Sequence, residues 1–437
     1  MPGSVTRVES TTVTLGVLGC GNVGAALCDL VLRDGDEIAE RTGVRLRIGK
    51  VAVRSLSKER GVDLPVDLFT TDGAAVVADP AIDLIVELFG GIEPAREYIT
   101  RALGARKPVV TANKELLANV GAELFAAAES AGVDLLFEGA VAGGIPLIRP
   151  LRESLVGESI TRVMGIVNGT TNFILSQMAA NGTSYVDALA EAQTLGYAER
   201  DPTADVEGYD AGAKAAIIAS IAFGVRVVAG DVYHEGISGI GDSDIAFAAQ
   251  LGYTIKLLAI CERFDDGSVA VRVHPAMVPN SHPLASVRDS FNAVFVEGEA
   301  VGELMFYGRG AGGYPTASAV LGDVIDAALN LSRGTSASIG QLSRCQVRPI
   351  DELSSPFYLN LEVADQPGVL ATVASVFGRH GVSIRSMEQE GLGVGARLVF
   401  ITHRAREADV RSTLRDLAEL DVVGRVGSVL RVIDGER

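Results

Sequence analysis

The chain has 437 residues, of which 48% are hydrophobic and 21% charged, and its formal net charge is −17 at pH 7. This length predicts two or three domains, and the composition is typical of a globular α/β enzyme and excludes a disordered chain. The acidic balance disfavours nucleic acids and anionic membranes, because both need clustered Lys and Arg. We therefore expect no nucleic-acid and no membrane partner.

The four cysteines, Cys20, Cys28, Cys261 and Cys345, form no C-x-x-C pair, and the five histidines are scattered. Neither a zinc site nor a disulfide framework is predicted. The first residues lack the apolar core of a signal peptide, and the longest apolar run, residues 215–225, is too short to cross a bilayer. We expect a cytoplasmic protein.

Residues 1–145 are predicted to form the first domain. Short β-branched runs alternate here with amphipathic segments, and the strand candidates are "VTLGVLG", "LRIGKVAV", "DLIVEL", "PVVTAN" and "VDLLFEGA". This alternation indicates βαβ units. We predict a Rossmann-type, doubly wound parallel sheet, which places the chain in the α/β class.

A glycine fingerprint follows the first strand. In "GVLGCGNVG", Gly19, Gly21 and Gly24 have the G-x-G-x-x-G spacing, directly before a predicted helix. Such glycines allow a tight turn and close approach of the backbone to a pyrophosphate, which the helix N-terminus stabilises. The motif predicts a dinucleotide site, and a tight turn without a ligand is the alternative.

The end of the second strand indicates which dinucleotide binds. An acid at this position would bind the ribose 2′-hydroxyl of NAD, but "VAVRSLSKER" provides Arg54, Ser55 and Lys58 instead. Two bases and a hydroxyl suit a 2′-phosphate, so we predict a preference for NADP. Ordinary surface bases would explain the same residues, and NAD therefore stays an alternative.

Residues 146–313 are predicted to form an α+β catalytic and dimerisation domain. Longer helical patterns alternate here with the strand candidates "ITRVMGIVNG", "SVAVRVHPAMV" and "FNAVFVEGEAVGELMFYG". The segment "YTIKLLAICERF" has the pattern of an apolar helix, which would place Cys261 in the core. Residues 314–345 are predicted to contain a helix that returns to the nucleotide-binding domain.

The last part of the chain is predicted to be a separate unit. Pro and Ser residues indicate a linker over residues 346–356. Residues 357–437 then have the order strand, helix, strand, strand, helix, strand. This βαββαβ order predicts a ferredoxin-like fold.

A run of charges, "ERDPTADVEGYDAGAK", precedes an apolar helix. Lys214 lies three and four residues before Ile217 and Ile218, so it shares their apolar face, and Asp210 lies one turn earlier on that face. A surface salt bridge is the alternative. Burial would lower the pKa of this lysine and the carboxylate would raise it, which suits a group that transfers a proton.

These stretches together resemble the homoserine dehydrogenase family over nearly the whole chain. The resemblance rests on "GVLGCGNVG", "TANK", "EGAVAGGIPLI", "GIVNGTTNFIL", "LGYAERDPTADVEGYDAGAK" and "GRGAGGYPTASAV". It implies reversible, NAD(P)-dependent interconversion of L-aspartate 4-semialdehyde and L-homoserine, on the route to threonine and methionine. No kinase-like region precedes the first strand, so the resemblance implies the monofunctional form.

The resemblance also implies roles for single residues. Lys214 would donate or accept the proton, and Lys114 would be a second lysine near the reacting carbon. Residues that resemble the family's substrate contacts are Glu199, Asp205, Asp210 and Thr170. The implied cofactor contacts are Gly19, Gly21, Asn22, Val23, Gly24, Arg54, Lys58, Lys114, Gly169 and Gly310.

A monovalent cation site is implied by "EGAVAGGIPLI". Its oxygen ligands would be Glu138 and the carbonyls of Val141, Gly143 and Ile145. Such ligands suit a hard ion, and Na⁺ is expected. The spacing alone favours a glycine-rich turn without an ion.

The final residues resemble an ACT domain through "ADQPGVLATVASVF". The resemblance implies a threonine effector, but Ser383 stands where many amino-acid-binding members carry asparagine. A domain that only mediates assembly is the alternative. We expect a homodimer or a homotetramer.

Two other functions are compatible with parts of the sequence. Aspartate-semialdehyde dehydrogenase would need a nucleophilic cysteine in the second domain, and the candidate, Cys261, lies in an apolar pattern that places it in the core. A non-catalytic dinucleotide-binding sensor of amino acids would not need both lysines and the three substrate acids. The sequence favours the dehydrogenase.

Overall fold

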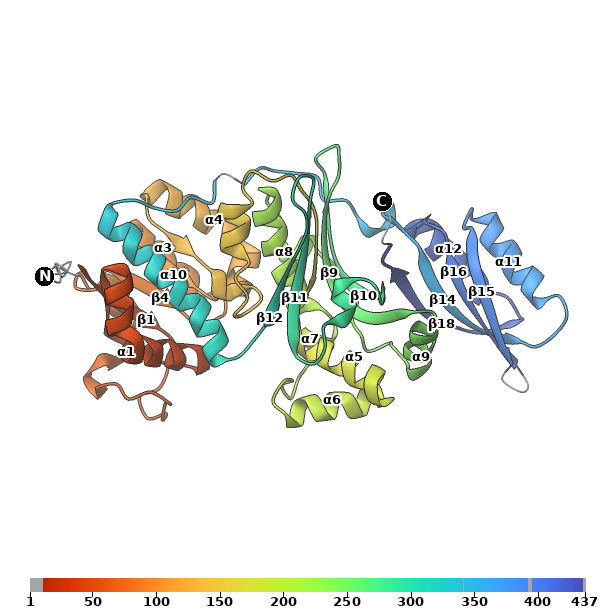
Figure 1. Ribbon diagram of the computed structural model, residues 1–437, viewed down its shortest axis with the longest axis horizontal. Helices are drawn as coiled ribbons and strands as arrows, with labels where there is room; N and C mark the ends of the chain where they lie inside the picture. The colour runs from red at the N-terminus through yellow and green to blue at the C-terminus, as the bar shows by residue number, and fades with distance from the viewer. Residues whose placement is uncertain (1–10, 341, 392–394, 435–437) are drawn as a thin grey trace, which may run out of the picture.

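The computed structural model describes residues 11–340, 342–391 and 395–434. The molecule is elongated (Figure 1), with the nucleotide-binding domain at one end, the unit predicted to be an ACT domain at the other, and a mixed α+β domain between them. The predicted fold class is confirmed.

The first domain contains, among its described residues, a six-stranded parallel sheet of order β3-β2-β1-β4-β5-β6. The strands are β1 Thr11–Leu18, β2 Val44–Ala52, β3 Phe69–Thr70, β4 Leu84–Glu87, β5 Val109–Thr111 and β6 Leu135–Leu136. Its helices are α1 Asn22–Thr42, α2 Gly73–Ala78, α3 Ala95–Gly104 and α4 Lys114–Ala131. All five predicted strands are present, and the strand order reverses between β1 and β4, where such folds bind ligands.

Helix α10, Gly313–Arg333, returns to this first domain as predicted. Its residues Ala317, Val320 and Val324 are buried in one cluster with Leu27 and Val31 of α1. The helix therefore closes the nucleotide-binding domain after the chain has built the second one.

The middle domain has strands on one side and helices on the other. The strands are β7 Ile160–Ile166, β8 Tyr233–His234, β9 Tyr253–Arg263, β10 Val269–Pro279, β11 Phe291–Gly298 and β12 Gly302–Arg309. The helices are α5 Gly169–Asn181, α6 Tyr185–Thr194, α7 Thr203–Val206, α8 Tyr209–Phe223 and α9 Asp242–Gln250.

One prediction in this domain is wrong, because "YTIKLLAICERF" is the strand β9 and not a helix. Both faces of β9 are covered, so residues Ile255 to Cys261 are all buried. A strand buried on both faces loses its alternating pattern and cannot be told from a buried helix by periodicity. The expected burial of Cys261 is nevertheless confirmed.

The C-terminal unit has the predicted βαββαβ order. Its elements are β14 Phe357–Ala364, α11 Val369–Arg379, β15 Ile384–Gly391, β16 Gly395–Thr402, α12 Glu407–Ala418 and β18 Val423–Val432. The short strands β13 Ser354–Ser355 and β17 Ala405–Arg406 pair with each other.

This unit is not separate from the middle domain. Strand β18 pairs in parallel with β10, and Ala276 lies opposite Arg431. The strands of the middle domain and of the C-terminal unit, apart from β13 and β17, thus form one sheet of order β12-β11-β7-β9-β10-β18-β14-β16-β15, with β8 also paired to β10. The sequence predicted an independent module, but a shared sheet connects it to the middle domain.

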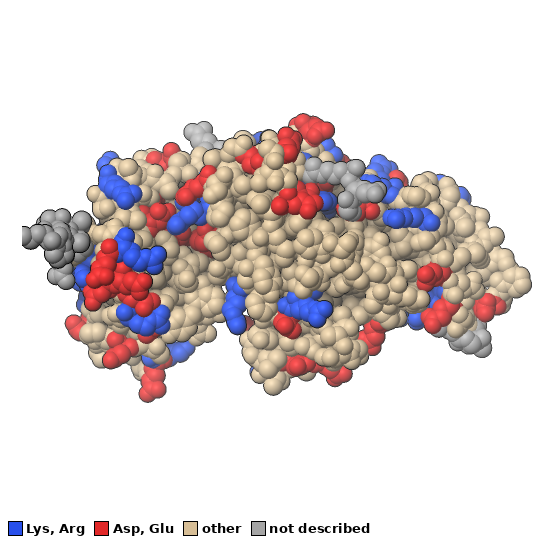
Figure 2. Space-filling view, viewed as in Figure 1, with Lys and Arg blue, Asp and Glu red and all other residues tan. Residues whose placement is uncertain are grey.

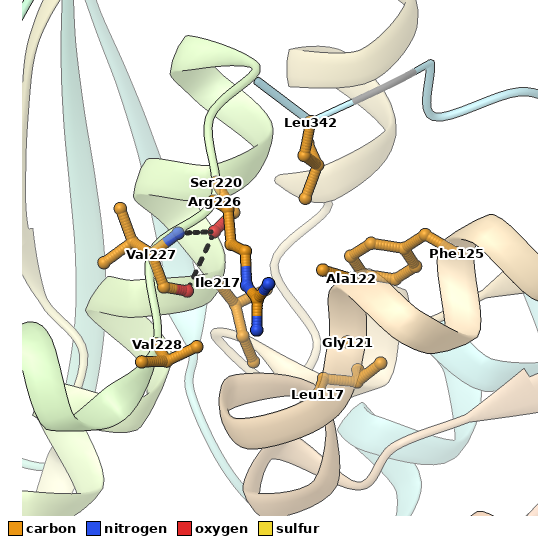
Figure 3. A pocket seen from close by; sticks show the side chains of 10 residues that line it. All are labelled: Leu117, Gly121, Ala122, Phe125, Ile217, Ser220, Arg226, Val227, Val228 and Leu342. Carbon is orange, nitrogen blue, oxygen red and sulfur yellow. Dashed lines mark hydrogen bonds between the residues drawn. The ribbon is translucent and has the colours of Figure 1, made fainter. Parts of the chain in front are cut away.

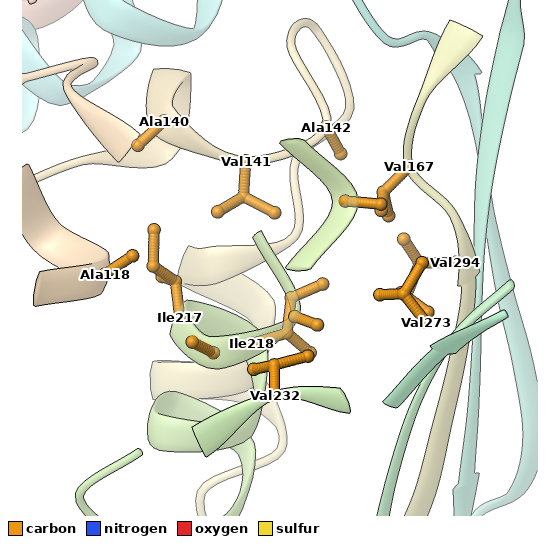
Figure 4. Close-up of a cluster of buried hydrophobic side chains, with 14 of the residues drawn as sticks. Ala118, Ala140, Val141, Ala142, Val167, Ile217, Ile218, Val232, Val273 and Val294 are labelled. Atoms are coloured by element: carbon orange, nitrogen blue, oxygen red, sulfur yellow. The ribbon is translucent and has the colours of Figure 1, made fainter. Parts of the chain in front are cut away.

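The first two domains also share a hydrophobic core. Figure 4 shows Ile217 and Ile218 of α8 beside Ala118 of α4 and Val141 of the segment that follows β6. Because these side chains are buried together, α4 and α8 pack as neighbouring helices. In the described part of the chain, no helix is both long and apolar enough to cross a membrane.

Charged side chains are mixed over the visible surface. Figure 2 shows Asp and Glu next to Lys and Arg in most places, and no continuous basic face. The outline is indented at the lower edge, between the nucleotide-binding domain and the lobe that carries α5 and α6.

Candidate active site

Helix α8 carries the two residues that the charge pattern selected. Asp210 and Lys214 are each 9% exposed, and Lys214 Nζ lies 2.7 Å from Asp210 Oδ2. Both side chains point inward, as helical phase predicted. Nearly every residue of α8 is buried, so the helix lies inside the protein rather than along its surface.

Asp210 lies between two lysines. Its Oδ1 pairs with Lys114 Nζ, at the start of α4, while Oδ2 accepts hydrogen bonds from Lys214 and from the Asn168 amide at 2.9 Å. Lys214 Nζ also donates to the carbonyl of Val167 at 2.7 Å. An ammonium group has three donors, so Lys214 keeps one for another partner.

Asn168 connects the acids of this site, and sequence reasoning missed it. Its Nδ2 donates to Asp205 Oδ1 at 2.7 Å and to Asp210 Oδ2, while its Oδ1 accepts from the backbone N–H of Thr171 and caps α5. The signal was available, because Asn168 opens the "NGTT" that starts α5. Its role depends on acids far along the chain.

The pKa values of these groups differ in direction. Burial lowers the pKa of Lys214 below its ordinary value, and Asp210 only partly opposes this effect. Burial opposes ionisation of Lys114 too, but there the charge of Asp210 prevails and raises the pKa. Burial also acts against the Asp210 carboxylate, yet the two ammonium groups keep its pKa well below the usual range. Burial raises the pKa of Asp205.

The seam between α4 and α8 fixes the distance between the two lysines. Figure 3 shows Leu117 and Phe125 of α4 facing Ile217 of α8, and Ser220 exchanging hydrogen bonds with the backbone of Val227. The cavity left between them measures only about 10 Å³, which is too small for a ligand. The seam is therefore a packing interface.

A buried carboxyl places the helix that carries Lys114. Glu87, at the end of β4, accepts from the backbone N–H groups of Phe89 and Gly90 and from Thr111 Oγ1. Asn113 caps α4 and donates to the carbonyl of Gly91 at 2.6 Å. Burial raises the pKa of Glu87. The turn after β4 and the start of α4 are therefore joined, which sequence reasoning did not predict.

The predicted substrate residues are only partly brought together. Thr170 is buried, and its Oγ1 donates to the carbonyl of Tyr197 at 2.6 Å. Glu199 lies on the exposed segment between α6 and α7, and its side chain forms no hydrogen bond or ion pair with the described residues. Glu207, which the resemblance left unassigned, accepts a hydrogen bond from Ser238.

The glycine fingerprint has the geometry that its pattern predicted. Gly19 has φ +106°, and a Cβ on Gly24 would lie 2.2 Å from the carbonyl oxygen of Gly19. A Cβ on Gly21 would meet nothing within 4 Å. Helix α1 starts at Asn22 without a side-chain cap or an acid in its first turn. The start of α1 beside Gly21 is therefore uncapped and has room for an anion, which helix N-termini bind.

A surface cavity of about 270 Å³ lies beside this loop. It is lined by Gly21, Asn22, Lys58, Arg60 and Tyr314 among others. Arg60 was not predicted: its guanidinium lies over the Phe69 ring at 5.3 Å and donates to two backbone carbonyls, while its Nε is buried without a partner among the described residues. Arg54 is exposed and does not line this cavity, whereas Lys58 does.

Three further predicted cofactor residues do not line this cavity. Val23 is half-buried on α1. Gly169 starts α5, and a Cβ there would lie 2.7 Å from the carbonyl oxygen of Ser290. A Cβ on Gly310 would overlap the Asn292 amide. For Gly169 and Gly310, close packing alone therefore explains why a glycine stands there.

The predicted cation segment follows β6. Both oxygens of the Glu138 carboxylate accept backbone N–H groups, with Ile148 at 2.7 Å and Arg149 at 2.8 Å. Among the described residues, no hydrogen bond uses the carbonyls of Val141, Gly143 or Ile145. Within the part of the chain that the structure describes, no group of three or more His, Cys, Asp or Glu is placed to bind a metal. Any ion here would therefore depend on backbone oxygens.

Cys261 is unsuited to nucleophilic attack. It lies on β9, is 1% exposed and donates to the carbonyl of Ala215 at 3.4 Å. Burial raises the pKa of its thiol to about 12, whereas a nucleophilic cysteine needs a lowered pKa. The alternative of a cysteine-dependent semialdehyde dehydrogenase has no support in this geometry.

Comparison with known proteins gives the family. The profile described as "Homoserine dehydrogenase, NAD binding domain" matches residues 19–138, the profile "Homoserine dehydrogenase" matches residues 146–325, and the ACT domain profile matches residues 357–422. The fold and the site thus define an NAD(P)-dependent oxidoreductase with a C-terminal ACT domain. The homoserine dehydrogenase of Mycobacterium tuberculosis (strain ATCC 25618 / H37Rv) is 51% identical over 445 residues, covering 99% of each chain. The chain belongs to the homoserine dehydrogenase family.

Solved structures agree with this assignment. The structure of a homoserine dehydrogenase from Thiobacillus denitrificans superposes with a TM-score of 0.91 at 40% identity, covering 98% of this chain and 99% of that one. A hyperthermophilic archaeal homoserine dehydrogenase mutant in complex with NADPH has a TM-score of 0.61 at 29% identity, covering 73% and 98% of the two chains.

Proposed function

We propose that this chain interconverts L-homoserine and L-aspartate 4-semialdehyde with NADP, and that Lys214 transfers the proton. The observation that carries the proposal is the buried Lys214–Asp210 pair, in which one donor of the lysine has no partner among the described residues. The family assignment supports the reaction class, and the geometry of the pair supports the choice of Lys214.

Lys214 suits the proton transfer better than Lys114. Burial lowers the pKa of Lys214, whereas Asp210 raises that of Lys114. In the oxidation direction, the neutral Lys214 amine accepts the hydroxyl proton of homoserine as its carbon loses a hydride. In the reduction direction, the Lys214 ammonium donates a proton to the aldehyde oxygen. Lys114 stays protonated and stabilises negative charge on that oxygen.

The acids of the site orient the lysine and bind the substrate's ammonium group. Asp210 is fully engaged by the two lysines and Asn168, so its main role is to position Lys214. One carboxylate oxygen of Asp205 has no hydrogen-bond partner among the described residues, and Glu199 is exposed near it in the chain, so these two suit the ammonium group. Thr170 fixes the segment that carries Glu199.

NADP fits the residues around the fingerprint. The first turn of α1, with Gly21 and Asn22, would hold the pyrophosphate, and Lys58 with Arg54 would hold the 2′-phosphate. The bound nicotinamide supplies the hydride acceptor and donor. The NADPH in the archaeal homologue supports NADP as the cofactor, and NAD stays the alternative.

A monovalent cation fits the segment after β6. The unused carbonyls of Val141, Gly143 and Ile145 would be its ligands, together with an oxygen of Glu138. These hard oxygen donors suit Na⁺. The ion would stabilise the junction of the two domains, because Gly143 packs against the backbone of Gly310.

The ACT domain and the assembly complete the proposal. We infer an amino-acid effector, with threonine as the first candidate, and a homodimer or homotetramer formed by the middle domain. The reaction would lie on the route to threonine and methionine in the cytoplasm. The decisive assay is oxidation of L-homoserine by the purified chain with NADP⁺ and NAD⁺ in turn, and no turnover with either would refute the proposal.

A further inference from the structure

A cleft separates helix α9 from the sheet of the ACT domain. Its volume is about 370 Å³, and Ser243, Phe247 and Gln250 of α9 line one side. Glu388, Glu390 and Arg397 of β15 and β16 line the other side. None of these residues belongs to the active site or to the cofactor site.

Arg397 is the arginine that lines this cleft, and its side chain is held in place by its neighbours. Its guanidinium lies 5.7 Å from the centre of the Phe247 ring and pairs with Glu390 at 3.5 Å. Its Nε is buried and has no hydrogen-bond partner among the described residues. An arginine that is fixed by an aromatic ring and has unused donors is well suited to bind a carboxylate.

Acids stand beside this arginine on the same face of the sheet. Glu388 and Glu390 are two residues apart on β15, and Glu390 lies opposite Arg397 in the strand register. The cleft therefore presents a cation for a carboxylate and two carboxylates for an ammonium group. Ser243 and Gln250 add hydrogen-bonding groups, and the volume suits a small ligand.

We propose that this cleft binds a free amino acid, with its carboxylate on Arg397 and its ammonium group on Glu388 and Glu390. The inference rests on the proposed function, because the ligand would regulate that reaction. A zwitterion matches the arrangement better than an anion or a cation, since both signs of charge line one small space.

The cleft lies on the other face of the sheet from the turn that precedes α11. Leu398 and Phe400 of β16 pack with α11 in one cluster, while Arg397 and Val399 alternate with them and face α9. Gly368, in that turn, directly precedes the first residue of α11. The proposed site is therefore distinct from that turn.

Occupation of the cleft can reach the active site through α9. Asp244, in the first turn of α9, accepts hydrogen bonds from Ser428 Oγ at 2.6 Å and Tyr358 Oη at 3.2 Å, both in the ACT sheet. Helix α9 also packs against α5, which starts beside Asn168. A ligand that changes the spacing of α9 and the sheet would therefore act on the residue that joins Asp205 to Asp210.

Calorimetry with the full chain tests the site directly. L-Threonine, L-serine, L-isoleucine and L-lysine are titrated without homoserine or cofactor, and at least one is expected to bind. Arg397→Met should weaken that binding by about tenfold or more, because one partner of a charge pair is lost. Arg425→Met is the matched control, since Arg425 is an exposed arginine on β18 of the same sheet, and its binding should equal that of the unsubstituted chain.

The rate of homoserine oxidation without an added amino acid is measured separately for each variant. A failure of the proposed reaction is then seen independently of a failure of the cleft to bind an amino acid. If Arg397→Met lowers the melting temperature, the Glu388→Gln, Glu390→Gln double variant of exposed residues replaces it. The proposal is overturned if no amino acid binds, if both cleft variants bind normally, or if binding is lost only on substitution at Ser383 or Gly368.

Discussion

Lys214 and Asp210 lie one helical turn apart on α8, with Nζ 2.7 Å from Oδ2, and both side chains are buried. Because Asp210 also contacts Lys114 and Asn168, one carboxylate sets the charge around the lysine. Under the proposed mechanism, we expect the pH dependence of catalysis to follow this pair.

The first prediction concerns Asp210→Asn. In the proposed mechanism oxidation needs the neutral amine of Lys214, so kcat should rise with pH through a midpoint below the ordinary lysine pKa, which is about 10.4. Removal of the carboxylate takes away the charge that opposes the effect of burial, so the midpoint should fall further. The pH profile of kcat measures this, with exposed Asp201→Asn as control. A midpoint that stays in place would contradict the assigned role of Asp210.

A second prediction concerns Lys256, a buried lysine with no carboxylate partner within hydrogen-bond reach among the described residues. Its Nζ donates to Asn172 Oδ1 and the carbonyl of Val287, and burial lowers its pKa to about 8. The unfolded chain holds this proton up to about pH 10.4, so the free energy of unfolding should rise between about pH 8 and that value.

Lys256→Met should reduce this rise, since the titrating group is gone. Denaturant unfolding at a series of pH values measures it, and Lys50→Met on β2 is the control, because Lys50 lies near the surface and donates to the carbonyl of Asp67. An unchanged slope in Lys256→Met would show that Lys256 does not titrate in this range.

A third prediction concerns the connection between the ACT domain and the middle domain. Arg431 of β18 is 4% exposed and forms ion pairs with Glu235 at 2.9 Å and Glu407 at 2.6 Å. Arg431→Met would leave two carboxylates without their cation, which costs about 3–5 kcal/mol. Thermal unfolding should show a large loss of stability, whereas exposed Arg415→Met should change it by about 1 kcal/mol or less. Equal effects of the two substitutions would argue against this role.

A fourth prediction separates the two arginines near the cofactor loop. Arg54→Ala should raise the KM for NADP⁺ more than that for NAD⁺, because only NADP⁺ carries the 2′-phosphate. Arg60 already donates to the carbonyls of Ser55 and Lys58, so Arg60→Ala should disturb the loop and raise both KM values. Steady-state kinetics with each cofactor distinguish these results, and equal effects of Arg54→Ala on both would remove its phosphate contact.

Much of the fold and part of the site could be predicted, because local patterns carry them. The glycine spacing located the turn before α1, and helical phase turned Asp210 and Lys214 inward. Asn168, Glu87 and Arg60 were missed, since their partners come from other elements or, for Arg60, from a loop without a pattern. The pairing of β18 with β10 was missed as well, because a ladder of two residues leaves no periodic signal.

The most direct test of the mechanism is kcat for L-homoserine oxidation with NADP⁺ in Lys214→Ala, with Lys50→Ala as control. We predict a fall of about 10²–10⁴ in kcat, with an unchanged KM for NADP⁺ and a folded structure, because the proton acceptor is lost while the cofactor site stays intact. A kcat equal to that of the unsubstituted chain would contradict the account and leave Lys214 as a structural ion-pair residue.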